Sequence, residues 1–124
     1  MDEILELILQ TVREHCGISV RADELPAQGG VYAELGEGKP EGVYYNHAAI
    51  WMIPVLFICK SADQKFCIQA LQTICNYLQT LKIYPQMDSA AWLDSAVSVQ
   101  PHKIGRQEDG QYLYSCIINN KFYF

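Results

Sequence analysis

The sequence predicts an α+β domain in which two main helices pack on a four-stranded sheet, mixed or antiparallel. Apolar residues recur at helical spacing in residues 2–16 and 61–81, which indicates two amphipathic helices. β-Branched and aromatic residues gather in residues 31–35, 48–59 and 96–119, and the last of these segments is predicted to be a C-terminal β-hairpin. The resulting order is α-β-β-α-β-β.

The composition fits a single domain that spans residues 1–124. Half of the residues are hydrophobic and 19% are charged, which excludes general disorder. The formal net charge is −5 and the nine basic residues are scattered, so neither a nucleic acid nor an anionic membrane surface is an expected partner. The five cysteines are an odd number without CxxC spacing, which favours buried free thiols in a reducing compartment.

The first helix is predicted to run from Asp2 to about Cys16. Asp2 can cap its first turn, and Gly17 is a natural end. One side of this helix is expected to face the core. The apolar residues on that side are Ile4, Leu5, Ile8, Leu9, Val12 and Cys16.

Glycine and proline interrupt residues 18–47, which are therefore predicted to be loop-rich with one short strand at 31–35. The segment from Gly36 to Asn46 reads as a mobile connection. Its glycines fit neither GxxxxGK[ST] nor GxGxxG, and its acidic residues would repel phosphate, so no nucleotide site is predicted.

Residues 48–59 form a twelve-residue uncharged run, AAIWMIPVLFIC. A helix needs roughly 20 apolar residues to cross a bilayer, and Pro54 interrupts helical hydrogen bonding, so the run is predicted to be a strand. Both of its faces are apolar, which means that it is covered on two sides or that one side meets a partner. Because proline cannot donate to a ladder, Pro54 predicts a bulge or a free edge, and such an edge is an assembly candidate.

The second helix is predicted to begin at Ser61, where Ser61 and Gln64 form an S-x-x-Q capping box and Asp63 adds charge at the favourable end. Its outward residues are polar but uncharged, which suits contact with protein as well as with water. Tyr84-Pro85 ends the helical region. The predicted core stripe comprises Cys67, Leu71, Ile74, Cys75, Leu78 and Leu81, widened by Phe66 and Ala70.

Residues 83–95 are predicted to be a connection from which Trp92 and Leu93 dock on the core. The hairpin follows, with its turn at Gly105–Gly110 and positive φ supplied by Asp109-Gly110. The closing aromatic residues either pack or favour association. They are Phe122, Tyr123 and Phe124.

No catalytic, cofactor-binding or metal-binding residue is predicted. The histidines, His15, His47 and His102, fit no metal-binding spacing. A cysteine nucleophile needs a base within reach. His47 and Cys59 lie at opposite ends of one predicted strand, and His102 contacts Cys116 across the hairpin only with a shifted register. The residues therefore do not favour a thiol enzyme.

The stretch PVLFICKSADQKFCIQALQTICNYLQTL, residues 54–81, resembles part of the small minor capsid or tail-terminator proteins of long-tailed phages and prophages of Gram-positive hosts. In that family an apolar strand runs into a helix start of the form KS-x-DQ, followed by spaced leucines. The chain length and the closing hairpin agree as well. The matching residues are Lys60, Ser61, Asp63, Gln64, Leu71, Leu78 and Leu81.

This resemblance implies a non-enzymatic virion protein that forms a ring, commonly a hexamer, which caps the tail tube and joins it to the head connector. Its partners are then further copies of itself, the tail tube protein and the connector protein. Assembly takes place in the bacterial cytoplasm, and no cofactor carries over. The residues expected at the assembly interface are Gly38, Lys39, Glu41, Tyr44, Tyr45, Pro54, Phe122 and Phe124.

Two alternatives remain open from the residues alone. One is a bacterial protein–protein interaction or adaptor domain of similar fold. The other is a small cysteine-dependent enzyme, in which Cys59, Cys116 or His102 would be needed for activity.

Overall fold

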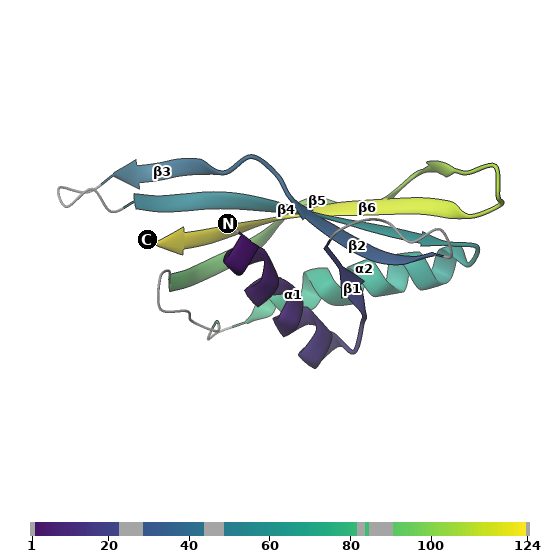
Figure 1. Ribbon diagram of the computed structural model, residues 1–124, viewed down its shortest axis with the longest axis horizontal. Helices are drawn as coiled ribbons and strands as arrows, with labels where there is room; N and C mark the ends of the chain where they lie inside the picture. Colours follow the sequence, from purple (N-terminus) through teal and green to yellow (C-terminus); the bar gives the residue numbers. More distant parts are fainter. Residues whose placement is uncertain (1, 23–28, 44–48, 82–83, 85–90, 124) are drawn as a thin grey trace.

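The computed structural model describes residues 2–22, 29–43, 49–81, 84 and 91–123, and the structural findings concern those residues. The α+β class, with two helices and a mixed sheet, is confirmed (Figure 1). The elements in chain order are α1 (Asp2–Cys16), β1 (Val20–Arg21), β2 (Gly30–Leu35), β3 (Lys39–Val43), β4 (Ala49–Ser61), α2 (Gln64–Thr80), β5 (Ala91–Arg106) and β6 (Tyr112–Tyr123).

The sheet has six strands in the described part of the chain, so the prediction of four strands in the order α-β-β-α-β-β is wrong in detail. Strands lie in the order β1-β2-β4-β6-β5, and β3 pairs with β4 beside β2. Only β1 and β2 are parallel among these neighbours. The two strands that the sequence did not predict, VR and KPEGV, lack apolar alternation and are held by pairing with their neighbours.

β3 also corrects the predicted mobile connection from Gly36 to Asn46, because residues 39–43 form a strand against the first part of β4. The glycines and the proline of this segment indicated a loop. A register irregularity between Pro40 and Gly42 shows how the ladder accommodates them.

β4 is a central strand, so the free edge predicted at Pro54 is wrong. β6 pairs along one side of β4. On the other side β2 pairs with residues 55–60 and β3 with residues 49–52. Pro54 lies in the gap between them, and its carbonyl accepts a hydrogen bond from the Gly36 N–H at 2.8 Å. A strand residue directs its N–H and C=O to the same side. An N–H at residue 54 would therefore point toward the gap between β2 and β3, where neither strand offers a ladder acceptor, so the proline costs no hydrogen bond there.

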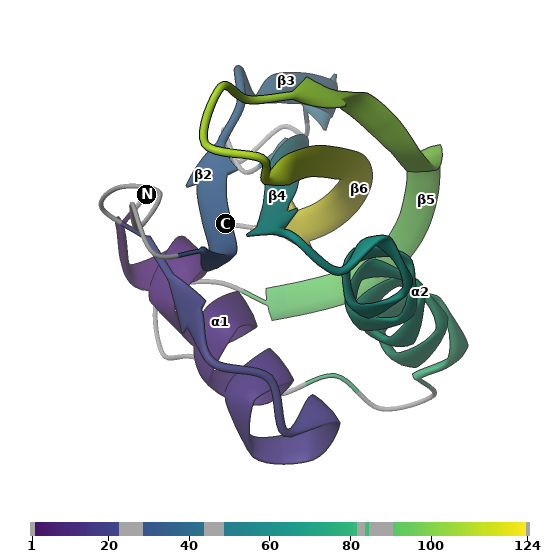
Figure 2. The same ribbon diagram turned by 90° about the vertical axis from the view of Figure 1, so that its right-hand side faces the viewer.

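Side chains of β4 alternate between two different environments. The odd-numbered residues from Ile53 to Cys59 are at most 1% exposed, whereas the even-numbered residues from Met52 to Ile58 are half-buried. Figures 1 and 2 show both helices on the same side of the sheet, and α1 contacts α2 there. We call this side the helix-covered face and the opposite side the open face.

Both helices direct their predicted stripes toward the core. α1 has the predicted bounds, and Gly17, which follows it, has a φ of 68°. Phe66, predicted to widen the stripe of α2, is instead 45% exposed. The buried residues of α2 are Cys67, Ala70, Leu71, Ile74, Cys75 and Leu78.

The predicted capping box at Ser61 is wrong because β4 continues through that residue. The helix starts at Gln64, and the N-cap is Asp63, whose carboxylate accepts hydrogen bonds from the Lys65 and Phe66 N–H groups. The Ser61 hydroxyl accepts a hydrogen bond from the Asp63 N–H at 3.0 Å. Ser61 therefore shapes the turn between strand and helix, and Asp63 caps the helix.

The C-terminal hairpin is confirmed, and it is longer than predicted. β5 already begins at Ala91, so Trp92 and Leu93 belong to a strand rather than to a connection. Trp92 is buried as predicted, but Leu93 is 46% exposed. Gly110 supplies the positive φ of the turn, at 85°. Four register shifts along β5 accompany the bend of the hairpin that Figure 2 shows.

A buried polar network joins three adjacent strands, β4, β6 and β5. The indole N–H of Trp92 donates to the Ser95 hydroxyl at 3.0 Å, and that hydroxyl donates to Asn120 Oδ1 at 2.6 Å. The Asn120 side-chain amide donates to the carbonyls of Ile53 and Ile118. Asn120 is 0% exposed, so its amide replaces water for groups on β4, β5 and β6.

We predict that Asn120→Ala lowers the free energy of unfolding by about 3 kcal/mol, because it leaves the Ser95 hydroxyl and the Ile53 carbonyl without their partner. Asn119→Ala is the matched control on the same strand, where Asn119 is half-buried on the open face. Its expected cost is below about 0.5 kcal/mol. Urea unfolding of both variants measures the difference, and equal losses would show that the network is not a major source of stability.

Candidate functional site

The open face carries an apolar patch at the centre of the sheet. Alternation along β4 places Met52, Pro54, Leu56 and Ile58 on this face, and Ile117 of β6 is in register with Leu56. All five side chains are half-buried, and no helix of the described chain covers them (Figure 2). We call these five residues the open-face patch.

Charges border the open-face patch on both neighbouring strands, beside its middle on β2 and beside one end on β6. Glu34 of β2 is in register with Leu56, and Lys121 of β6 is in register with Met52. Asn119, which is uncharged, lies beside Pro54. An apolar centre with a polar rim is the usual composition of a protein–protein contact surface.

The structure places the predicted interface residues in several environments. Pro54 is in the open-face patch, Gly38 lies just before β3, and Lys39 and Glu41 belong to β3. Phe122 corrects the prediction of an accessible aromatic residue: it is 0% exposed and stacks in the core on a ring of β5. The remaining predicted residues, Tyr44, Tyr45 and Phe124, lie outside the described residues.

Sequence reasoning did not select Met52, Leu56, Ile58 and Ile117 as interface residues. The signal was present in the sequence, because an apolar strand with two apolar faces has more surface than one layer of helices can cover. What was missing is that both helices lie on the same side.

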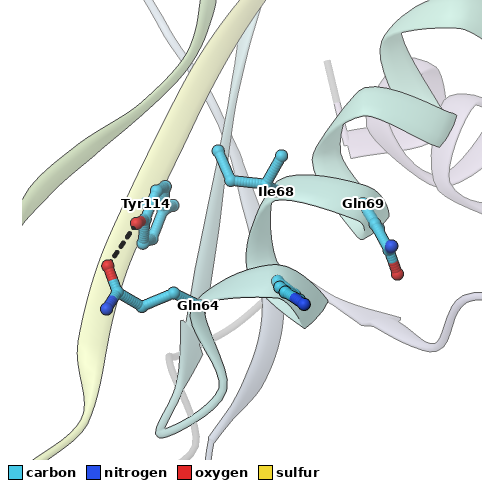
Figure 3. A pocket seen from close by; sticks show the side chains of 5 residues that line it. Gln64, Ile68, Gln69 and Tyr114 are labelled. Carbon is cyan, nitrogen blue, oxygen red and sulfur yellow. Dashed lines mark hydrogen bonds between the residues drawn. The ribbon is translucent and has the colours of Figure 1, made fainter.

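A second surface feature is a hollow of about 410 Å³ at the start of α2 (Figure 3). Ile68, on its wall, is 37% exposed. The Tyr114 hydroxyl donates to Gln64 Oε1 at 2.7 Å, which fixes the edge of the hollow. No charged residue occurs from Phe66 to Leu81, so Lys65 is the charged member of the lining. The lining residues are Gln64, Lys65, Ile68, Gln69 and Tyr114.

The structure does not bring a histidine to a thiol on the hairpin. His102 is in register with Ser115 on the neighbouring strand. Cys116, the next residue, points to the opposite face of the sheet, so the imidazole and the thiol do not meet. A hydrogen bond with Cys75, together with burial, raises the pKa of the Cys116 thiol, which disfavours a nucleophilic thiolate. His47 lies outside the described residues.

Two further searches bear only on the part of the chain that the structure describes. There, no group of three or more histidine, cysteine, aspartate or glutamate side chains is arranged to hold a metal ion. Neither helix of that part has the combination of length and hydrophobicity required to span a bilayer.

No family model matches the chain, and no curated protein matches it. The surfaces of the molecule are therefore the basis of the functional argument.

The hairpin turn is tied to the end of the open face by an ion pair. Lys60 is 7% exposed, and its Nζ lies 3.1 Å from Asp109 Oδ2. Asp109 also accepts a hydrogen bond from the Gln111 N–H at 3.0 Å. The backbone hydrogen bond from Gln111, followed by the interaction with Lys60, lowers the pKa of Asp109.

We predict that this contact makes stability depend on pH in the acid range. Since the folded pKa of Asp109 is lowered, its contribution is complete above the unfolded value of about 3.9 and is lost as the pH falls through the folded pKa. Thermal unfolding between pH 7 and pH 2 should show a smaller acid-induced decrease in Asp109→Asn than in the unsubstituted chain. Glu108→Gln, on the same turn, is the control and should keep the full decrease; an unchanged profile in Asp109→Asn contradicts the assignment.

Proposed function

We propose that this chain is a non-enzymatic virion structural protein of a long-tailed phage or prophage, a tail terminator. It forms a ring that caps the tail tube and joins it to the head connector. Its partners are other copies of itself, the tail tube protein and the connector protein. It is assembled in the bacterial cytoplasm and resides in the virion.

The open-face patch is the observation that carries this proposal. A sheet with helices on one side presents a broad, preformed surface on the other, and an apolar centre with few charges suits burial against protein. A closed ring needs each copy to contact its neighbours through two different surfaces. The open face of the curved sheet can supply one of these surfaces without a change in the fold.

The resemblance at residues 54–81 adds support from the sequence. Its residues fall at the junction where β4 ends and α2 begins, at Lys60, Ser61 and Asp63. Lys60 forms the ion pair with Asp109, Ser61 accepts a hydrogen bond from the Asp63 N–H, and Asp63 caps α2. These contacts stabilise the junction of β4 and α2 in any protein with this fold. The assembly experiment is therefore the specific test of the proposal.

We predict that Leu56→Lys weakens ring assembly and tube binding by at least about 30-fold, because it places a charge at the centre of a surface that becomes buried. The unsubstituted chain should bind polymerised tail tubes of its own phage and stop their elongation. Co-sedimentation and measurement of tube lengths by electron microscopy report both effects. Circular dichroism checks that the half-buried position tolerates the substitution.

Ile68→Lys is the matched control, since Ile68 is an exposed aliphatic residue on α2, on the other side of the sheet. It should assemble and bind as the unsubstituted chain does. Failure of the unsubstituted chain to bind polymerised tubes would refute the proposed function. Normal assembly of Leu56→Lys would refute the role of the open-face patch.

The hollow at the start of α2 favours a second candidate function, an adaptor domain that binds a partner protein. A half-exposed Ile68 among uncharged polar groups can receive an apolar side chain. This candidate predicts the opposite result from the same two variants. Ile68→Lys then loses the partner and Leu56→Lys keeps it, in a pull-down with the products of neighbouring genes.

A further inference from the structure

Four of the five cysteines meet in two pairs between α2 and the sheet. Cys67 in α2 lies against Cys59 at the end of β4, and its thiol donates to the Cys59 carbonyl oxygen at 3.7 Å. Cys75, two helical turns further on, lies on the buried stripe of α2 that contacts β6, where Cys116 points to the same helix-covered face. All four residues are 0% exposed and none is oxidised.

The arrangement of the sheet explains why two pairs form. Cys59 is in register with Tyr114, and Cys116 is in register with Phe57, so both cysteines point to the helix-covered face on adjacent strands. On α2, Cys67 and Cys75 are eight residues apart, about 12 Å along the helix axis, and lie on the same buried stripe. The sequence predicts these residues only to be buried thiols, because the pairing depends on how the helix crosses the strands.

We propose that Cys59–Cys67 and Cys75–Cys116 are sites of intramolecular disulfide formation, at which a low-molecular-weight disulfide oxidant links α2 covalently to β4 and β6. This proposal does not depend on the proposed function. In a reducing compartment both pairs stay as thiols. Outside such a compartment they can be converted to bridges that hold the helix on the sheet.

The chemistry is thiol–disulfide exchange. One protein thiolate attacks a sulfur of the oxidant and expels a small thiolate, which gives a mixed disulfide. The second cysteine of the pair, after losing its proton to solvent, attacks the protein sulfur of that mixed disulfide and expels the second small thiolate. Each bridge removes two protons and two electrons from the protein and reduces one oxidant molecule to two thiols.

The two pairs should react at different rates. The hydrogen bond from Cys116 lowers the pKa of Cys75, which makes Cys75 the first nucleophile of its pair. Burial raises the pKa of both Cys59 and Cys67, so this pair is the slower one. Because all four sulfurs are buried, the oxidant reaches them when α2 moves away from the sheet, and mild urea should accelerate both reactions.

The test begins with the reduced full-length chain and oxidised glutathione at pH 8, without urea and with urea below the unfolding transition. Mass spectrometry should show the loss of two hydrogen atoms per bridge without retained glutathione. Chymotryptic cleavage after Leu71 separates Cys67 from Cys75, so a non-reduced peptide map identifies each pair. We expect Cys75–Cys116 first and Cys59–Cys67 second, and a thermal midpoint raised by about 10 °C that a reducing agent reverses.

Single substitutions serve as controls for the assignment. Cys67→Ser should form only the Cys75–Cys116 bridge and Cys75→Ser only the Cys59–Cys67 bridge, whereas Cys16→Ser, which lies in α1, should form both. The peptide map of the unsubstituted chain needs no variant to fold. The proposal is overturned if neither condition yields these bridges, or if the bridges formed are intermolecular, involve Cys16 or join other partners.

Discussion

The sheet depends on the position of Pro54 in its central strand. A proline in a central strand removes one donor from a ladder. Here β2 and β3 pair along the same edge of β4, β2 with residues 55–60 and β3 with residues 49–52, so that Pro54 lies in the gap between them. Gly36 makes the crossing between them possible. A Cβ atom on Gly36 would lie 2.9 Å from the Pro54 ring, closer than side chains approach in folded proteins. Pro54, which has no N–H, and Gly36, which has no side chain, thus determine where β2 ends beside β4.

The two faces of β4 differ in what they contribute to the molecule. The helix-covered face contains the core, the Asn120 network and the two cysteine pairs, all of which join elements distant in sequence. Within the described residues, the open face carries neither a helix nor such a network, and its apolar side chains are only half-buried. Stability is concentrated on one side, and the proposed assembly contacts lie on the other. The ion pair between Lys60 and Asp109 lies at the boundary and ties the hairpin turn to the sheet.

Local sequence patterns were sufficient for the elements with strong periodicity. The bounds of α1, the buried stripe of α2 and the existence of the hairpin follow from apolar spacing and from Gly17 and Gly110. Patterns failed where pairing rather than local preference decides, as in β3, and where a strand ran on past its apolar residues to Ser61.

The candidate site was predictable only in part. The two apolar faces of β4 and the importance of Pro54 could be read from the sequence, but which face the helices cover depends on the three-dimensional path of the chain. Phe122 is an example of what the sequence alone does not determine. An aromatic residue near the C-terminus can be exposed for association or buried, and Phe122 is buried because it stacks on Trp92.

The strand order also has a consequence for biosynthesis. β4 pairs with β6 across sequence separations of 51 residues (Ser61 with Tyr112) to 73 residues (Ile50 with Tyr123). During translation β4 therefore leaves the ribosome with one edge unpaired until β6 has been made. Folding that depends on such distant pairing is slow and exposes strands to aggregation. The gap between β4 and β6 in the sequence thus sets how long this edge stays unpaired in the nascent chain.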